Sequence, residues 1–191
     1  MKKLFKSPFC YNQCMRNFNT FTKLLLEYNK IHRLSGAKNA KEVEENIQDS
    51  LYPMQYLDLD KIKNAVDIGT GAGFPGMILA IAYPEIEFTL VEPLMKRTAF
   101  LHLVKSSYGL QNVTIQSDRI ENIKPFKADL ITSRAVAKTE FLINLANDFI
   151  YEDSILLFYK GENVYQEIKE NMNTKIIQRG KRNYLFIEGI K

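Results

Sequence analysis

A glycine-rich stretch, residues 67–76, constrains the fold of this chain more than any other part of the sequence. It reads Asp-Ile-Gly-Thr-Gly-Ala-Gly-Phe-Pro-Gly. The apolar run before it, 62–68, predicts a short buried strand, and the apolar run after it, 77–83, predicts a buried helix. Glycine tolerates positive φ and lets a ligand approach the backbone closely. A strand, a glycine turn and a helix N-terminus in this order are typical of a nucleotide or nucleoside site.

The chemistry around this loop narrows the choice of ligand. The spacing Gly71-x-Gly73-x-x-Gly76 matches the dinucleotide fingerprint, which is a weak signal by itself. Pro75 has no N–H, so it removes one donor that a phosphate would use. Asp67, at the end of the strand, would oppose a pyrophosphate and favour a ligand that carries an ammonium or a sulfonium. We therefore expect a cationic ligand.

A second acidic residue supports the same ligand class. Glu92 ends the next strand, where a carboxylate can accept hydrogen bonds from both ribose hydroxyls; as an alternative it is an acid favoured at a helix start. S-adenosylmethionine carries an amine, a sulfonium and a ribose, so the residues favour S-adenosylmethionine. An NAD(P)-binding Rossmann oxidoreductase is the main alternative, against which Pro75 and the lack of a Tyr-x-x-x-Lys pair in the core argue. A non-catalytic RNA-binding module is a further alternative.

The order of apolar segments predicts an α/β fold with a doubly wound parallel sheet. Strands at 62–68, 86–92, 112–116, 128–133 and 154–159 alternate with helices at 75–83, 94–108, 138–150 and 162–171. Two further strands, 174–178 and 183–187, predict a closing antiparallel hairpin. A sheet of about seven strands that ends in such a hairpin is the layout of class I methyltransferases, a known architecture.

The N-terminal part differs from this core in charge. Residues 1–41 contain nine Lys or Arg and one acid, Glu27, which is +8 against +4 for the whole chain. Helices are expected at 18–34 and at 42–57, the latter broken near Pro53. We expect residues 1–59 to form a basic helical extension packed on the core, and 60–191 to form the S-adenosylmethionine-binding domain. The basic charge predicts contact with nucleic acid, while packing of the interleaved aromatic residues on the core is an alternative that can hold at the same time.

Composition suggests an ordinary globular protein of the cytoplasm. Hydrophobic residues make up 46% and charged residues 25% of the chain, and no apolar stretch approaches the length of a membrane span. Two cysteines, Cys10 and Cys14, are too few for a disulfide framework or, without further ligands, for a metal site. We therefore expect a monomer without a metal ion or a membrane partner.

Several motifs resemble those of one family. The loop at 67–76 is similar to the S-adenosylmethionine loop of the ribosomal RNA small subunit methyltransferase G family, also called glucose-inhibited division protein B. Supporting motifs follow in the family's order, and the match runs from about residue 24 to 161: Tyr28-Asn29-Lys30-Ile31-His32-Arg33-Leu34, Asp49-Ser50-Leu51, Glu92 with Lys96-Arg97 and Phe100-Leu101, Arg119-Ile120-Glu121, Ser133-Arg134-Ala135-Val136 and Lys160-Gly161. The family commonly has a histidine where this chain has Asn46.

The resemblance implies transfer of a methyl group from S-adenosylmethionine to N7 of a guanine in 16S rRNA or the small ribosomal subunit. Guanine N7 has a lone pair and no proton to lose, so no general base is expected, and alignment supplies most of the catalysis. A methyltransferase acting on a protein or a small molecule is the remaining alternative.

The residues expected at the site fall into two groups. The cofactor-binding candidates follow the strands or lie in the loop: Asp67, Gly69, Gly71, Gly73, Phe74, Glu92, Ile120, Glu121 and Arg134. By the resemblance, Gly69 and Phe74 line the loop, and Ile120 and Glu121 bracket the adenine. The candidates for orienting the substrate are Arg119, Arg134 and Lys160, for which surface ion pairing or simple solvation are the alternatives.

Overall fold

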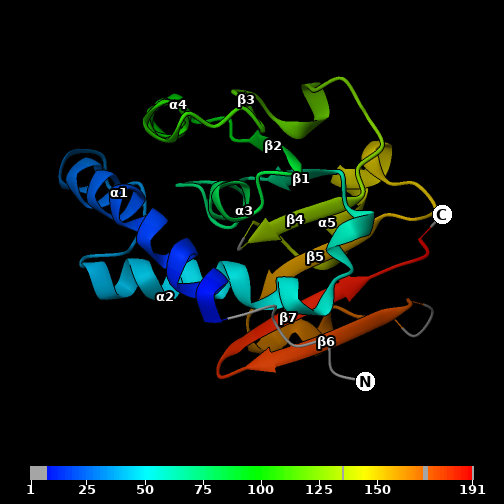
Figure 1. The fold of residues 1–191 in the computed structure, drawn as a ribbon. Coiled ribbons are helices and arrows are strands. Elements are labelled where there is room, and N and C mark those ends of the chain that lie inside the picture. Colours follow the sequence, from blue (N-terminus) through cyan, green and yellow to red (C-terminus); the bar gives the residue numbers. More distant parts are fainter. Residues whose placement is uncertain (1–7, 135, 170–171, 191) are drawn as a thin grey trace.

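A computed structural model describes residues 8–134, 136–169 and 172–190, with side chains from residue 18 onward. Seven strands form one sheet in the order β3-β2-β1-β4-β5-β7-β6 (Figure 1). Their bounds are β1 Asn64–Ile68, β2 Glu87–Val91, β3 Val113–Gln116, β4 Leu130–Arg134, β5 Ile155–Lys160, β6 Thr174–Arg179 and β7 Arg182–Ile187. The first five strands are parallel, and β7 runs antiparallel to both β5 and β6. The predicted parallel sheet and closing hairpin are confirmed.

The chain reverses its direction of winding at β1. This strand pairs with β2 on one side and with β4 on the other. Ligands of open α/β sheets bind outside the carboxyl ends of the strands at such a switch point. The carboxyl ends of β1 to β5 are called the C-terminal end of the sheet below. The loop at 67–76 begins there, directly after β1.

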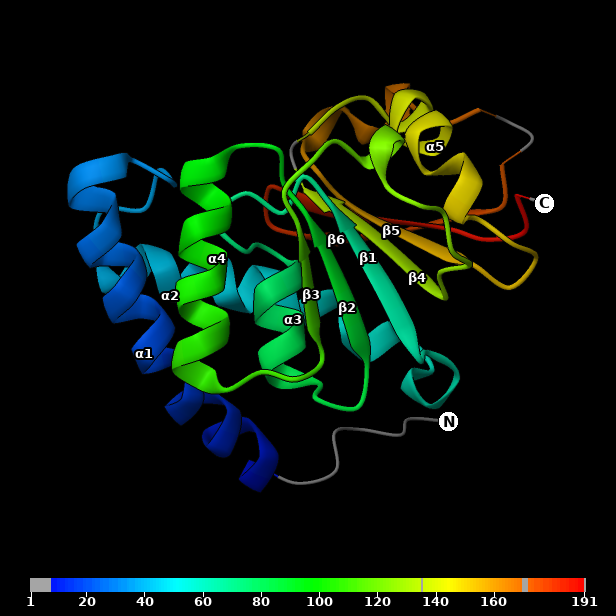
Figure 2. The ribbon, with the colours of Figure 1, turned by 90° about the horizontal axis from the view of Figure 1, so that it is seen from above.

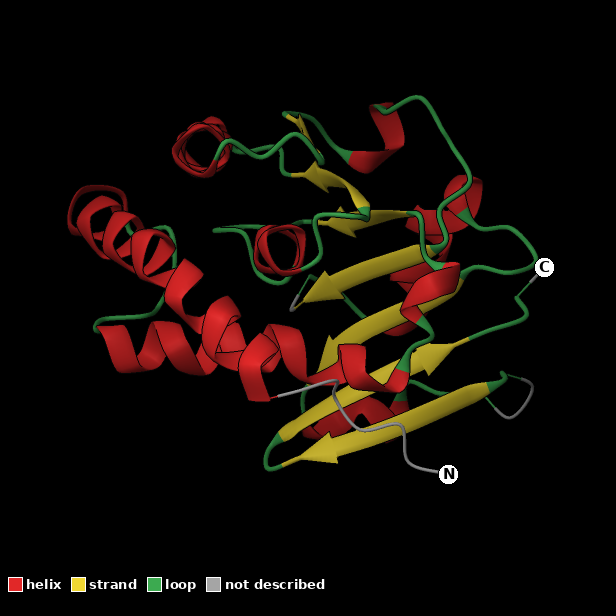
Figure 3. Ribbon diagram, viewed as in Figure 1, coloured by secondary structure: helices red, strands yellow, loops and turns green. Residues whose placement is uncertain are grey.

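Helices cover both faces of the sheet (Figures 2 and 3). One face carries four helices that share a core with the strands: α1 Pro8–His32, α2 Ala40–Leu51, α3 Gly76–Ala82 and α4 Met95–Tyr108. The other face carries α5 Thr139–Ala146 and the short 3-10 helices η3 Ile120–Asn122 and η4 Asn147–Phe149, which pack in a second core. The strands of a parallel sheet are buried on both faces, so helices have to cover both sides of the sheet.

Two predicted helices end differently from expectation. The segment expected at 42–57 forms α2 to Leu51 and then a 3-10 helix, η1 Tyr52–Tyr56, because Pro53 is tolerated only in a first helical turn. The helix expected at 162–171 is wrong over residues 162–169, where the structure describes only the 3-10 helix η5 Glu162–Gln166; residues 170–171 lie outside the described part of the chain. Val164 is the one residue of η5 that is buried, so the segment lacks an apolar stripe to hold a longer helix. A further short 3-10 helix, η2 Leu59–Lys61, precedes β1.

The N-terminal helices are part of the main core. Phe21 of α1 is fully buried, and its ring lies edge-on to Phe74 and Phe100, with centroid distances of 5.4 and 5.9 Å. Phe18 is also buried, whereas the basic residues Lys23 and Lys30 face solvent. The aromatic residues therefore pack on the core while the cations stay exposed, and a domain boundary at residues 59 and 60 stays a prediction.

Some of the expected features fall outside the described part of the chain. These are Lys2, Lys3, Lys6 and Ala135, together with the side chains of Cys10, Cys14 and Arg16. In the part of the chain that the structure describes, no helix is long and apolar enough to span a membrane.

Candidate active site

The glycine loop leaves β1 in a left-handed conformation. Gly69, Gly71 and Gly73 have φ values of +70°, +61° and +93°. The N–H groups of Gly69 and Thr70 both donate to the carbonyl of Val91, at 2.9 and 3.0 Å, which ties the loop to the end of β2. Residues with a side chain avoid such φ values, so the glycines are required by the turn. Around Gly71 the space is open, because an added Cβ would meet only the Gly69 carbonyl oxygen, at 3.9 Å.

Asp67 holds the start of α3 against β1. Its side chain is fully buried, and its oxygens accept hydrogen bonds from the Gly76 N–H at 2.9 Å and from the Thr132 hydroxyl at 2.7 Å. Burial raises the pKa of this carboxyl, and the hydrogen bonds act in the opposite direction. A Cβ on Gly76 would lie 2.6 Å from Asp67 Oδ2, so only glycine allows this approach. The carboxylate thus faces the protein, and its direct contact with a cationic ligand stays a prediction.

Glu92 connects the loop to the start of α4. The side chain is almost completely buried, and it accepts hydrogen bonds from the N–H groups of Gly71 and Leu94, both at 3.0 Å. Arg97 Nη1 lies 3.3 Å from Glu92 Oε2. Each carboxylate oxygen has two lone pairs; Oε2 already accepts from Gly71 and Arg97, so one acceptor site remains, on Oε1, for a ribose hydroxyl. Glu92 also serves the helix start, because Leu94 is the N-cap residue of α4.

Arg134 lies beside the glycine loop at the end of β4. Its guanidinium lies over the Phe74 ring, 4.9 Å from the centroid, and Nη1 is 3.2 Å from Asp49 Oδ2. Burial lowers the pKa of Arg134, and the charge of Asp49 counteracts this change. Asp49 also accepts from Arg182 Nε at 3.2 Å and from the Tyr184 hydroxyl at 2.8 Å. The side chain of Arg134 is only 15% exposed, so the pair is not an ordinary surface ion pair.

Lys160, at the end of β5, is held inside the protein. Its Nζ donates to the Ala137 carbonyl and to Glu167 Oε2, both at 2.8 Å. The same Glu167 oxygen accepts from the N–H and the hydroxyl of Thr139 at 2.7 Å. Lys160 is only 7% exposed, so simple solvation is wrong. The contacts position the connection between β4 and α5, and direct contact of Lys160 with the substrate stays a prediction.

That connection reaches back to the glycine loop through Val136. A Cβ on Gly69 would lie 2.7 Å from Val136 Cγ2. Gly69 is therefore covered by a side chain from the segment that Lys160 and Thr139 hold in place. In the sequence, Val136 is only the last residue of the Ser-Arg-Ala-Val motif. The structure shows that its side chain lies over Gly69.

Arg119, Ile120 and Glu121 lie at the far end of the site. Ile120 is buried in η3, while Arg119 and Glu121 are exposed. They follow β3, which is separated from β4 by β2 and β1. Three strand spacings amount to about 14 Å, so the structure does not bring Arg119 beside Arg134. Lys160 ends β5, the direct neighbour of β4.

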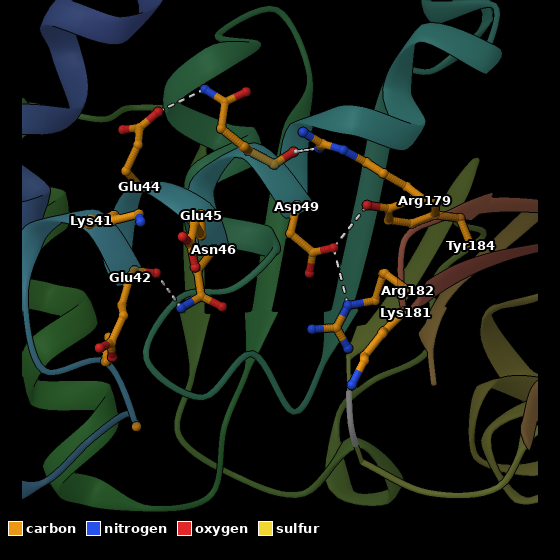
Figure 4. Close-up of a pocket in the computed structure, with 13 residues that line it drawn as sticks. Lys41, Glu42, Glu44, Glu45, Asn46, Asp49, Arg179, Lys181, Arg182 and Tyr184 are labelled. Atoms are coloured by element: carbon orange, nitrogen blue, oxygen red, sulfur yellow. Dashed lines mark hydrogen bonds and ion pairs between the residues drawn. The ribbon is translucent and has the colours of Figure 1, made fainter. Parts of the chain in front are cut away.

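A groove adjoins this site that the sequence did not predict. It has a volume of about 930 Å³ and lies between α2 and the turn that joins β6 to β7 (Figure 4). Its walls include Glu45, Asn46 and Asp49 from α2, and Lys181, Arg182 and Tyr184 from the hairpin. Asp49 belongs to both the groove and the Arg134 pair, so it connects the groove wall to the end of β4. The Asp-Ser motif was its only sequence signal.

Solved structures share this fold. Ribosomal protein L11 methylase from Lactobacillus delbrueckii subsp. bulgaricus is 16% identical with a TM-score of 0.61, over 81% of this chain and 80% of that chain. MtNAS, in a structure that contains S-adenosylmethionine, is 13% identical with a TM-score of 0.60, over 93% of this chain and 76% of that chain. At these identities the likeness shows the fold, which is that of class I S-adenosylmethionine-dependent methyltransferases.

Sequence relatives are much more similar. Ribosomal RNA small subunit methyltransferase G from Wolinella succinogenes is 48% identical over 188 residues, which is 98% of this chain and 96% of the relative. The protein of the same name from Aliarcobacter butzleri is 41% identical over 182 residues, 94% of this chain and 91% of the relative. A family model described as rRNA small subunit methyltransferase G matches residues 14–188. The chain therefore belongs to the rRNA small subunit methyltransferase G family.

Proposed function

We propose that this protein methylates N7 of one guanine in 16S rRNA by direct displacement, without a general base. Family membership makes it an rRNA methyltransferase that uses S-adenosylmethionine, and the oxidoreductase alternative is thereby set aside. The position of the methylated atom is the new part of this statement. The observation that carries it concerns the two acids at the C-terminal end of β1 and β2. Asp67 and Glu92 both accept hydrogen bonds from N–H groups of the protein, so neither is placed as a free general base, and N7 is an acceptor that needs none.

A reaction at N7 suits these groups. The N7 lone pair forms the new bond to the methyl carbon while the carbon–sulfur bond breaks and its electron pair stays on sulfur. The positive charge moves from sulfur to the guanine ring, and no proton leaves N7. S-adenosylmethionine, when bound, supplies the electrophilic methyl group. The protein therefore has to bind and orient the two reactants and to exclude water. Alignment of the reacting atoms supplies most of the catalysis.

The structure offers a fitting place for the cofactor. The open space at Gly71 allows a ligand to approach the loop, and the remaining acceptor site on Glu92 Oε1 suits a ribose hydroxyl. Ile120 and Glu121 follow β3, the strand beside β2, where the adenine would lie. Arg134 ends β4, on the other side of β1, and would hold the cofactor carboxylate. Gly69, Gly73 and Phe74 would shape the loop between these two ends.

The substrate would approach the same end of the sheet. Arg134 and Lys160 end neighbouring strands, so their backbone positions are suited to steer a nucleotide toward the methyl group. Arg119, about 14 Å away by the strand spacing, is placed for the cofactor side or for more distant RNA. We expect the protein to act as a monomer in the cytoplasm, with the small subunit or its 16S rRNA as partner.

A transfer assay tests this proposal. The purified protein is incubated with labelled S-adenosylmethionine and small subunits from cells that lack the endogenous enzyme, and the RNA is cleaved chemically at N7-methylguanosine. Label at one guanine, and its loss with Glu92→Ala, are expected. Label on another atom of the RNA would contradict N7 as the acceptor. Label only on protein or on small molecules would contradict the RNA substrate.

A further inference from the structure

The groove between α2 and the β6–β7 turn has two walls of different chemistry. Glu45 and Asn46 precede Asp49 by four and three residues, so each of them lies on the same side of α2 as Asp49. The hairpin supplies Lys181 and Arg182 to the opposite wall (Figure 4). The α2 wall thus presents several hydrogen-bond acceptors besides Lys41, and the hairpin wall presents cations. A nucleotide has complementary groups, because its base carries N–H donors and its phosphate is anionic.

Two acceptors on α2 are free to bind a ligand. Asp49 is already bonded to Arg134, Arg182 and Tyr184. Glu45 is exposed and has no hydrogen bond or ion pair with any residue that the structure describes. Asn46 donates through Nδ2 to the Glu42 carbonyl at 2.8 Å, which turns its Oδ1 away from that bond. The Glu45 carboxylate and Asn46 Oδ1 are therefore adjacent acceptors on the groove wall.

Methylation at N7 restricts how a guanine can be recognised. The commonest protein contact to guanine is an Arg or Lys that donates to O6 and N7. Such a contact would occupy the lone pair that must attack the methyl group. Recognition must then depend on the Watson–Crick edge, where guanine presents N1–H and the 2-amino group, which are both donors. Carboxylate and amide oxygens are the side-chain groups that accept from them.

The position of these acceptors also suits the reaction. Glu45 precedes Asp49 by about one helical turn, a distance of about 6 Å along the axis. Asp49 contacts Arg134, which lies on Phe74 of the glycine loop. A purine whose Watson–Crick edge is bound at the α2 wall turns its N7 edge away from that wall. Lys181, exposed on the hairpin side, is available to a phosphate.

We propose that Glu45 and Asn46 read the Watson–Crick edge of the target guanine in this groove, with Lys181 placed for its phosphate. The inference rests on the proposed function, because it explains how guanine is selected when N7 must stay free. It assigns base specificity to α2, which lies outside the glycine loop and its strand ends.

Mononucleotides test the inference separately from catalysis. The protein is saturated with S-adenosylhomocysteine so that the cofactor site is filled, and GMP and IMP are titrated by NMR. IMP lacks the 2-amino group and keeps N7, so wild-type protein should bind GMP about tenfold more tightly, the value of one charge-assisted hydrogen bond. Glu45→Ala should bring the two affinities close together, and Asn46→Ala should weaken both.

Glu44→Ala is the matched control. It removes the same charge from the same helix, but the Glu44 carboxylate accepts from Gln48 Nε2 at 2.8 Å, so the preference for GMP should survive. Equal binding of GMP and IMP by wild-type protein, no detectable GMP binding, or an unchanged preference in Glu45→Ala would each overturn the inference. If subunits are not methylated while the preference still depends on Glu45, the guanine site stands and the rRNA substrate fails. If subunits are methylated but Glu45→Ala keeps the preference, only the base-reading role fails.

Discussion

Arg134 and Asp49 join the end of β4 to the last turn of α2 through a 3.2 Å ion pair that is mostly shielded from solvent. The pair brings a helix from the N-terminal part of the chain against the glycine loop, since Arg134 also covers Phe74. Removing one partner of a shielded pair leaves the other charge without compensation, which costs more than the pair itself contributes.

We therefore expect Asp49→Ala to lose about 3 kcal/mol of unfolding free energy, because Arg134, Arg182 and Tyr184 all lose their acceptor. Urea denaturation measures the loss. Asp58→Ala is the control, since the Asp58 side chain makes, with the residues that the structure describes, only an exposed ion pair with Lys61 at 3.9 Å. Equal stability of the two variants would show that the Asp49 cluster does not hold α2 on the core.

Glu92→Gln should lower the affinity for S-adenosylmethionine about tenfold or more, because a neutral amide has only one acceptor oxygen for the loop N–H, the Leu94 N–H and the ribose. Calorimetric titration gives the affinity. Arg97→Met is the companion variant, since it removes the ion pair at 3.3 Å and leaves the carboxylate. If Glu92→Gln binds like wild type, Glu92 is only the acid at the start of α4.

Gly76→Ala should destabilise the fold by about 1–3 kcal/mol, the usual cost of an extra methyl group in a tight core. The added Cβ would lie 2.5 Å from Leu90 Cδ2 and 2.6 Å from Asp67 Oδ2. Gly36→Ala is a matched control, because nothing lies within 4 Å of a Cβ there. Thermal unfolding compares the two. A Gly76→Ala protein as stable as Gly36→Ala would contradict the close contact between α3 and β1.

The environment of Glu167 predicts that the stability of the folded state depends on pH. Burial alone would raise the pKa of Glu167, but hydrogen bonds from Lys160 and Thr139 outweigh it and hold the pKa below the usual value of a glutamate carboxyl. A carboxyl whose pKa is lower in the folded state stabilises the fold above its unfolded pKa. This contribution is lost as the pH falls through the folded value.

The difference in unfolding free energy between wild type and Glu167→Gln should therefore be constant near neutral pH and shrink below about pH 4. Denaturation at several pH values measures it. Glu162→Gln, at an exposed position of η5, provides the comparison. A wild-type advantage that persisted unchanged through pH 3 would show that the Lys160 contact does not depend on the charge of Glu167.

The local sequence determined the elements that depend on short-range chemistry. The glycine turn at 69–73, the alternation of apolar strands and helices, and the closing hairpin are all set by residues close together in the chain, since φ preferences and hydrophobic periodicity act over a few positions. The same is true of Glu92, whose place at a strand end follows from the strand itself.

Only the tertiary structure decided which of these residues meet. The partners of Arg134, Lys160 and Asp67 lie far along the chain or on another element: Asp49 for Arg134, Ala137 and Glu167 for Lys160, and Thr132 for Asp67. Packing placed Arg134 and Lys160 in ion pairs inside the protein, and it exposed Glu45 on a groove whose sequence signal was the Asp-Ser motif alone. The physical reason is that a buried charge without a partner costs free energy. A charged side chain near a strand end therefore pairs with the groups that the packing of distant segments brings within hydrogen-bond distance.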